Sequence, residues 1–222
     1  MIDINETRKN ILAQIKKAHK QSYYKDEVNP ILVAVSKKQP DYKIDLALIS
    51  GQRNFAENRV QEAQQRWTEK FEKYKDLELR LIGPLQTNKV KQALELFDII
   101  ETIDREKLAN EISSKLNKET KAKTFYIQIN TGDETQKSGI SSYHADEFIN
   151  FCIKDLKLPV VGLMCIPPIN EEPAMHFSLL RKIAARNKLK ELSMGMSADF
   201  EEAIKFGATS VRVGSLFFGN RE

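Results

Sequence analysis

The feature of this sequence that most constrains its fold is a regular alternation of short apolar runs with longer amphipathic stretches. Eight runs have the character of strands: ILVAVS (31–36), RNFA (53–56), LRLIG (79–83), FDIIET (97–102), TFYIQIN (124–130), PVVGLM (159–164), ELSM (191–194) and TSVRVG (209–214). Between them, apolar residues recur at helical spacing, as at Leu108, Ile112 and Leu116. Continuous apolar strands alternating with helices predict a parallel sheet covered by helices, and eight such repeats close a (β/α)8 TIM-like barrel.

The sequence also predicts how this barrel is bounded. Residues 4–20 form an amphipathic pattern with Asp3 and Glu6 as a capping pair, which predicts an extra N-terminal helix ahead of the first strand. A chain of 222 residues with 41% apolar content is long enough for one large core, so we expect a single α/β domain over residues 1–222. An open doubly wound sheet is the alternative, but no G-x-G-x-x-G motif follows the first apolar run.

Composition argues against two classes of partner. Lys and Arg number 35 against 31 Asp and Glu, and the resulting net charge of +4 is spread along the chain, so we expect no nucleic-acid partner. The N-terminal stretch MIDINETRKNI lacks the apolar core of a signal peptide. No run approaches the roughly 20 apolar residues of a membrane span. We therefore expect a soluble, cytoplasmic protein with no membrane partner.

Cysteine and histidine give no sign of redox or metal chemistry. Cys152 and Cys165 lie in apolar surroundings without C-x-x-C spacing, which favours packed free thiols over a disulfide or a metal site. His19, His144 and His176 have no second ligand at metal spacing. We interpret these histidines as surface or capping residues and predict no metal site.

In a barrel of this kind, functional residues sit at the carboxyl ends of the strands and in the loops that follow. The first predicted strand ends in Ser36-Lys37-Lys38, two lysines directly after five apolar residues. Because side chains alternate along a strand, Lys37 and Lys38 point to opposite sides. The lysine facing the barrel mouth would be partly desolvated, which favours the neutral amine that attacks carbonyl groups. The alternative is that the strand simply reaches the surface there.

The last two predicted strands end in small and hydroxyl-bearing residues. In barrels, a phosphate is often held by the loops after strands 7 and 8 and by a short extra helix. Gly195 with Ser197, and Gly214 with Ser215, offer backbone N–H groups and hydroxyls at these two positions. The alternative is that Ser197 caps a helix over 198–206 and Gly214 only turns the chain. Asp199 opposes the phosphate interpretation, because its charge would repel an anion unless the side chain points away.

Arg212 lies between Val211 and Val213, near the end of a strand whose neighbours are core residues. A buried guanidinium needs an acceptor, because an isolated buried charge is very unfavourable. Either a carboxylate at the barrel rim or a ring nitrogen or anionic group of a cofactor would serve. A reactive lysine, a phosphate cradle and an arginine facing a ring nitrogen together indicate a pyridoxal phosphate site. A Schiff-base aldolase shares only the first two parts.

Eight ordered motifs resemble one known family, the pyridoxal phosphate homeostasis proteins, which are related to the N-terminal barrel of alanine racemase. The motifs are AVSKKQP, FAENRVQEAQQR, LIGPLQTNK, TIDR, IQINTGDETQKSGI, GLMCIPP, LSMGMSADFEEAI and VRVGSLFFGNR, from about residue 31 to the end. The resemblance implies that Lys37, not Lys38, carries the cofactor as an aldimine. It also implies that Arg212 faces the pyridine nitrogen and Asn58 lines the ring, while Ser197, Gly214 and Ser215 hold the phosphate.

The family resemblance further implies a role in intracellular pyridoxal phosphate (vitamin B6) and amino-acid homeostasis, without robust turnover. Expected partners are the cofactor itself and pyridoxal phosphate-dependent apoenzymes, and we expect a monomer. The alternatives are an amino-acid racemase or a Schiff-base phosphosugar aldolase. A two-base racemase needs a second acid/base opposite Lys37, which the related racemases take from a β-rich domain not expected here. The chain departs from the family at Ala56, usually glycine, and at Arg80, usually histidine.

Overall fold

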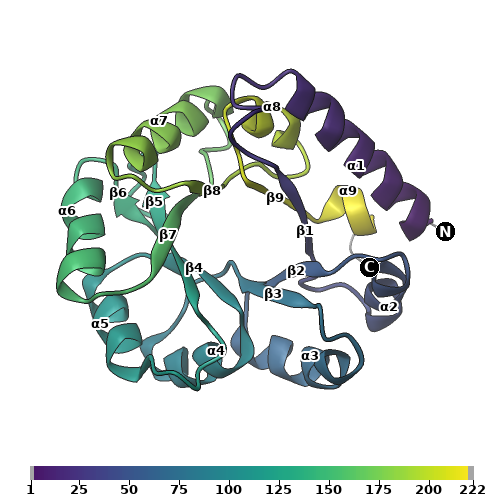
Figure 1. Ribbon diagram of the computed structural model, residues 1–222, viewed down its shortest axis with the longest axis horizontal. Helices are drawn as coiled ribbons and strands as arrows, with labels where there is room; N and C mark the ends of the chain where they lie inside the picture. Colours follow the sequence, from purple (N-terminus) through teal and green to yellow (C-terminus); the bar gives the residue numbers. More distant parts are fainter. Residues whose placement is uncertain (1–2, 220–222) are drawn as a thin grey trace.

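In the computed structural model, which describes residues 3–219, eight parallel strands close into a barrel ringed by helices (Figure 1). The barrel strands are β1 (Ile31–Val35), β2 (Asn54–Glu57), β3 (Glu78–Leu81), β4 (Ile99–Ile103), β5 (Thr124–Asn130), β7 (Val160–Cys165), β8 (Glu191–Ser193) and β9 (Ser210–Val213). They pair in this order, β4 pairs with β5, and β9 pairs in parallel with β1. The predicted (β/α)8 barrel is therefore confirmed, and the open sheet is wrong because the first and last strands join.

Helices cover the outside of the barrel. They are α2 (Asp41–Ile49), α3 (Val60–Lys73), α4 (Val90–Leu96), α5 (Glu106–Lys115), α6 (Ala145–Asn150), α7 (Pro173–Arg186), α8 (Phe200–Lys205) and α9 (Ser215–Phe218). A 3-10 turn at Thr87–Lys89 leads into α4, and a π-helical turn at Phe151–Asp155 continues α6. Each connection places a helix between consecutive strands, as parallel pairing requires.

The predicted extra helix is α1 (Ile4–Lys20), which precedes the barrel. The Asp3 carboxylate accepts the backbone N–H groups of Asn5 (2.9 Å) and Glu6 (3.1 Å), and so supplies acceptors for amides that the first turn leaves unpaired. Ile11 and Ile15 are among the residues buried on one face. Figure 1 shows α1 lying across α8 and α9, outside the β1–β9 junction, and these helices are in contact. The helix thus covers the place where the barrel closes.

The two faces of each strand have different surroundings. On β1, Leu32 and Ala34 belong to the main core between sheet and helices, whereas Val33 and Val35 form a separate small cluster with Ala56. The second cluster lies inside the barrel, because the pleat places alternate side chains on opposite faces. The barrel interior is not wholly apolar. Buried polar side chains also point inward from their strands, among them Arg80, Glu101, Ser193 and Arg212.

One strand was not predicted. The two residues of β6 (Ile140–Ser141) pair in parallel with the end of β5, at Ile129 and Asn130. This segment contains no apolar run, so periodicity alone gives no signal for it. It does not belong to the ring of eight, and the strand count that predicted the barrel is unaffected.

The histidine interpretation is wrong for His176, which is only 4% exposed. Its Nδ1 lies 3.0 Å from Thr131 Oγ1, because the first turn of α7 packs against the loop that follows β5. His144 is exposed at the start of α6, and the His19 ring contacts the carbonyl oxygen of Lys25 at 3.0 Å. Cys152 and Cys165 are buried free thiols, as predicted.

None of the helices within residues 3–219 combines the length and hydrophobicity needed to cross a membrane. No group of three or more His, Cys, Asp and Glu side chains in the same range is arranged to hold a metal ion.

Candidate functional site at the carboxyl ends of the strands

The residues singled out by the sequence follow four neighbouring strands of the barrel. Lys37 follows β1, Asn58 follows β2, Ser197 follows β8, and Gly214 and Ser215 follow β9. The order β8-β9-β1-β2 is continuous around the ring. Because these strands are parallel, their carboxyl ends lie at one end of the barrel. Closure between β1 and β9 therefore brings together segments from the two halves of the sequence.

Lys37 lies in a turn that begins where β1 ends. The backbone N–H of Gln39 donates to the carbonyl oxygen of Ser36 at 3.1 Å, which closes a four-residue turn over both lysines. Lys38 adopts a left-handed conformation with φ of 58° and is exposed, whereas Lys37 is half-buried. Lys37 also follows the inward-facing residues Val33 and Val35 at the same two-residue spacing. Burial favours Lys37 over Lys38 as the functional lysine.

Arg212 points into the barrel from β9 and is 3% exposed. Its Nη1 donates to Ser193 Oγ at 2.6 Å and its Nη2 to the carbonyl oxygen of Cys165 at 2.7 Å. Within the described part of the chain, no carboxylate lies within ion-pair distance (4.0 Å) of this guanidinium. The alternative of a direct salt bridge at the rim is therefore wrong, because neutral acceptors on β7 and β8 take that place.

A buried carboxylate lies one hydroxyl away from Arg212. Ser193 Oγ donates to Glu101 Oε2 at 2.5 Å, and Glu101 Oε1 accepts from Arg80 Nη1 at 3.0 Å. Burial alone would lower the pKa of Arg80, but attraction to Glu101 and Glu78 raises it above the ordinary arginine value. Burial, followed by repulsion from Glu101, raises the pKa of the nearby Tyr126 phenol. Arg80 thus remains cationic and forms part of a charged layer beneath the strand ends.

The loops after β8 and β9 converge on the Ser197 hydroxyl. Its oxygen accepts the backbone N–H groups of Gly214 (3.3 Å) and Leu216 (3.4 Å), and both distances are longer than a typical N–H···O bond. A Cβ added at Gly214 would approach no atom of the protein closer than 3.5 Å, so packing within the protein does not require glycine there. The Asp199 carboxylate accepts the N–H of Met196 at 2.6 Å. Asp199 is thus engaged with its own loop, where it also precedes α8 (Phe200–Lys205).

Asn58 carries an unsatisfied acceptor. Its Oδ1 is buried and has no hydrogen-bond partner within residues 3–219. Such an atom is unusual in a folded protein and commonly marks a place where a ligand or water binds. Gly83, which follows the neighbouring strand β3, allows the backbone to lie close to Asn58. A Cβ at this position would lie 2.2 Å from the Asn58 carbonyl oxygen.

The sequence placed Glu57 at a strand end but gave no role to Glu57 or Arg66. Glu57 is completely buried at the end of β2, and burial raises the pKa of its carboxyl group. Its Oε1 accepts from Arg66 Nη1 at 3.0 Å, and Arg66 also donates to backbone carbonyls beside Lys37. The one signal available in the sequence was that an acidic residue, Glu57, directly follows the apolar pair Phe55-Ala56 at the end of a predicted strand.

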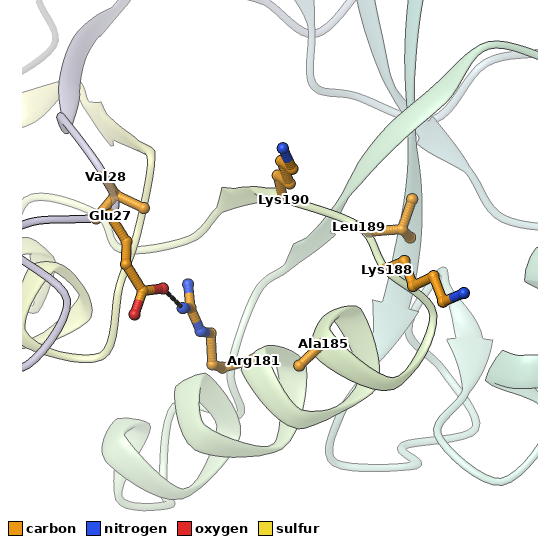
Figure 2. A pocket seen from close by; sticks show the side chains of 7 residues that line it. All are labelled: Glu27, Val28, Arg181, Ala185, Lys188, Leu189 and Lys190. Atoms are coloured by element: carbon orange, nitrogen blue, oxygen red, sulfur yellow. Dashed lines mark hydrogen bonds and ion pairs between the residues drawn. The ribbon is translucent and has the colours of Figure 1, made fainter.

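Two cavities help to delimit the site. One of about 560 Å3 lies beside Asn58 and is lined by residues of the loops after β2 and β3, including Arg59, Gln86 and Lys89. Figure 2 shows another, of about 480 Å3, beside the Glu27–Arg181 ion pair. That cavity lies near the amino ends of the strands, since its lining includes the segment 188–190 that leads into β8. Of these two cavities, the first borders the candidate site, and a third, of about 430 Å3, is lined in part by Ser197 and Leu216.

Comparison with known proteins identifies the family. The family model described as "Alanine racemase, N-terminal domain" matches residues 7–222. A pyridoxal phosphate homeostasis protein of Aquifex aeolicus is 36% identical over 228 aligned residues, which cover 98% of each chain. The chain belongs to this family. Another member, from Escherichia coli strain K12, is 37% identical over 204 residues and 86% of each chain.

Solved structures agree with the family assignment. PipY of Synechococcus elongatus PCC7942, solved with pyridoxal phosphate (PLP) bound, has a TM-score of 0.80 and 31% identity, and the match covers 97% of this chain and 100% of PipY. Alanine racemase from Corynebacterium glutamicum shares the fold alone, with a TM-score of 0.67 and 16% identity. The match covers 99% of this chain and 60% of that racemase. The homeostasis family therefore matches this chain along nearly all of its length.

Proposed function

We propose that the protein binds pyridoxal 5'-phosphate through Lys37 and acts in the homeostasis of this cofactor and of amino acids, without robust turnover of its own. The observation that carries the proposal is the placement of a half-buried lysine, a buried arginine and two convergent backbone N–H groups at neighbouring strand ends. Relatives that match along the chain are named for the homeostasis of this cofactor, and the PipY structure contains it.

Pyridoxal phosphate, when bound, supplies an aldehyde and an electron-accepting ring. The neutral amine of Lys37 adds to the aldehyde carbon, so that a C=N bond replaces the C=O bond and one water molecule leaves. Arg212 is held by Ser193 and Cys165 with its guanidinium inside the barrel, where it can donate to a ring nitrogen. The unsatisfied Oδ1 of Asn58 offers an acceptor beside the ring.

The phosphate group fits the loops after β8 and β9. The N–H groups of Gly214 and Leu216 already point to one place, and the Ser197 hydroxyl lies there. The absence of a side chain at Gly214 lets an anion approach the backbone, and Ser215 adds a hydroxyl. Successive backbone N–H groups that converge in this way bind anions in many proteins.

Arg212 argues against transamination and decarboxylation, whereas racemisation is opposed by the need for a second acid/base opposite Lys37. A guanidinium has a pKa above about 12 and acts only as a hydrogen-bond donor. A ring nitrogen that accepts from Arg212 therefore stays unprotonated, which weakens the ring as an electron acceptor. We infer that the protein holds the cofactor in the cytoplasm as a monomer and supplies it to pyridoxal phosphate-dependent apoenzymes.

An absorption spectrum tests the covalent attachment. The purified protein loaded with pyridoxal phosphate should show a near-visible band that borohydride removes. Lys37→Ala should abolish the band, whereas Lys38→Ala, the matched control in the same turn, should retain it. A band that survives in Lys37→Ala and is absent from Lys38→Ala would reverse the assignment. A protein that cannot be loaded would refute the cofactor proposal.

A comparison of vitamers tests the anion site. Pyridoxal without phosphate should bind much more weakly than pyridoxal phosphate, because it cannot use the N–H groups near Ser197. Ser197→Asp should weaken the binding of pyridoxal phosphate by placing like charge beside it. Similar affinities for the two vitamers would show that the phosphate binds elsewhere.

The holder proposal is separated from a racemase by assaying alanine, serine and other amino acids for racemisation and α-proton exchange, over a range of protein concentrations. We expect rates far below the ~10 per second typical of enzymes. Turnover near that rate, lost in Lys37→Ala, would identify the protein as a racemase. The range of protein concentrations tests whether another subunit donates the second acid/base.

A further inference from the structure

We infer that Arg66 is a positioning residue that fixes the turn carrying Lys37, and that Glu57 holds Arg66 in place. The inference extends the proposed function, because its cofactor readout depends on Lys37 being the attachment site. Its structural readout does not depend on the cofactor. For clarity, residues 36–39 are called the lysine turn.

Arg66 binds both ends of the lysine turn. From α3, its Nη1 donates to the carbonyl oxygen of Ser36 at 3.1 Å, and its Nη2 donates to the carbonyl oxygen of Gln39 at 2.9 Å. Its Nε donates to Asp41 Oδ1 at 2.8 Å, at the first residue of α2. One side chain therefore spans the whole connection between β1 and α2, with Lys37 and Lys38 between its two backbone contacts.

Arg66 is itself held from behind by a buried carboxylate. Glu57 Oε1 accepts from Arg66 Nη1 at 3.0 Å, from Ser36 Oγ at 2.7 Å and from Trp67 Nε1 at 3.2 Å. Glu57 and Trp67 are both completely buried, and the Arg66 side chain is 18% exposed. The same carboxylate oxygen thus contacts the turn and the residue that binds the turn.

The lysine turn needs such support because its own backbone is strained. Lys38 has φ of 58°, a conformation that residues with a Cβ adopt at an energetic disadvantage. Without Arg66, the carbonyl groups of Ser36 and Gln39 would lose their charged donor, and the turn would relax. The planar guanidinium presents several donors in fixed directions, so a single lysine ammonium cannot replace all four contacts of Arg66.

The test is Arg66→Met, compared with Arg66→Lys and with Arg53→Met as a matched control. Arg53 also donates to two backbone carbonyls, of Leu48 and Gln52 (2.8 and 2.9 Å), and pairs with Asp76. It lies before β2, at the opposite end of that strand from Glu57. Arg53→Met therefore removes the same kind of contacts without touching the lysine turn.

The first readout uses protein without cofactor. Hydrogen exchange of the backbone amides in residues 36–41 should become faster in Arg66→Met and remain unchanged in Arg53→Met. The second readout is the affinity for pyridoxal phosphate, which should fall roughly tenfold or more in Arg66→Met, because misplacement of a reacting group weakens its reaction steeply. Arg66→Lys keeps the charge and should give an intermediate value.

The outcomes separate this inference from the proposed function. If Arg66→Met and Arg53→Met change exchange at residues 36–41 and cofactor affinity equally, Arg66 has only a general structural role and the inference is wrong. If the wild-type protein binds no pyridoxal phosphate, the proposed function fails, while exchange in the lysine turn still decides whether Arg66 fixes it.

Discussion

Individual charged residues inside the barrel contribute to stability in a way that depends on their partners. Glu101 joins Arg80 on one side to Ser193 and Arg212 on the other, and it is completely buried. A buried pair of this kind need not favour folding over an apolar pair, but the loss of one partner leaves the other charge uncompensated. Arg80 keeps a second partner in Glu78, at 2.8 Å, so the loss is partly offset.

We predict that Glu101→Gln lowers the free energy of unfolding by about 3 kcal/mol, measured by urea denaturation. The control is Glu78→Gln, which removes the other carboxylate bound to Arg80. Because the Glu78 side chain is 34% exposed, that substitution should lower the free energy of unfolding by about 1 kcal/mol or less. Equal effects would show that burial of Glu101 is not the deciding factor.

The two cysteines provide a prediction about pH. Burial raises the pKa of Cys152 and Cys165 from the ordinary 9.0 to about 12 in the folded protein. Both thiols should therefore resist a thiol-specific reagent at pH 8 and react fully once the protein is denatured. Since folding raises these pKa values, the stability contributed by the protonated thiols is complete below pH 9 and is lost between pH 9 and about 12.

A variant with alanine at both cysteine positions tests this pH dependence. Its free energy of unfolding should decline less steeply than that of the wild type over the same pH range, because lysines and tyrosines titrate in both proteins. Rapid modification of either thiol in the native protein at pH 8 would contradict the assignment of both as packed core residues.

At the scale of elements, the first helix depends on its cap. Asp3 accepts two backbone N–H groups at the start of α1. We predict that Asp3→Ala lowers the free energy of unfolding by about 1 kcal/mol. Glu6→Gln, in the same helical turn, removes a charge but not the cap and should have a smaller effect. Urea denaturation of both variants checks the prediction.

The close approach of β2 and β3 near Asn58 supports a second prediction at this scale. In Gly83→Ala, the new Cβ would lie 2.2 Å from the Asn58 carbonyl oxygen, so the two strand ends must separate. Gly162→Ala creates an equally close contact with the Glu191 carbonyl oxygen, at the first residue of β8. Both variants should lose about 1–3 kcal/mol of stability. Only Gly83→Ala should also weaken the binding of pyridoxal phosphate, measured by spectroscopic titration.

The elements of the fold were largely predictable from sequence, because each barrel strand is an apolar run and α1 carries both its cap and its apolar face. Strand alternation placed Lys37 on the same side as Val33 and Val35 but did not decide which lysine faces the barrel mouth, and only the family resemblance favoured Lys37. The hydrogen-bond partners of the buried polar side chains were not predictable from the sequence. Arg66 lies in the polar stretch VQEAQQRW, and its contacts with the lysine turn depend on how α3 packs against another connection.

At the scale of the whole molecule, the proposed site joins the first and last strands of the barrel. A ligand bound at this proposed site would contact the loops after β8, β9, β1 and β2, so unfolding that separates β1 from β9 would release it. We predict that pyridoxal phosphate at 100 times its dissociation constant raises the free energy of unfolding by about 2.7 kcal/mol. The increase should largely disappear in Lys37→Ala. Thermal or urea denaturation, followed by circular dichroism, measures both.

The pairing of β1 with β9 also has a consequence for synthesis of the protein on the ribosome. Lys37 emerges well before the loops that contain Ser197 and Gly214. Until β9 has left the exit tunnel, β1 lacks one of its two neighbours in the ring. A nascent chain therefore has the lysine but not the proposed phosphate-binding loops. Under the proposed function, stable capture of the vitamin would therefore begin only when the ring has closed.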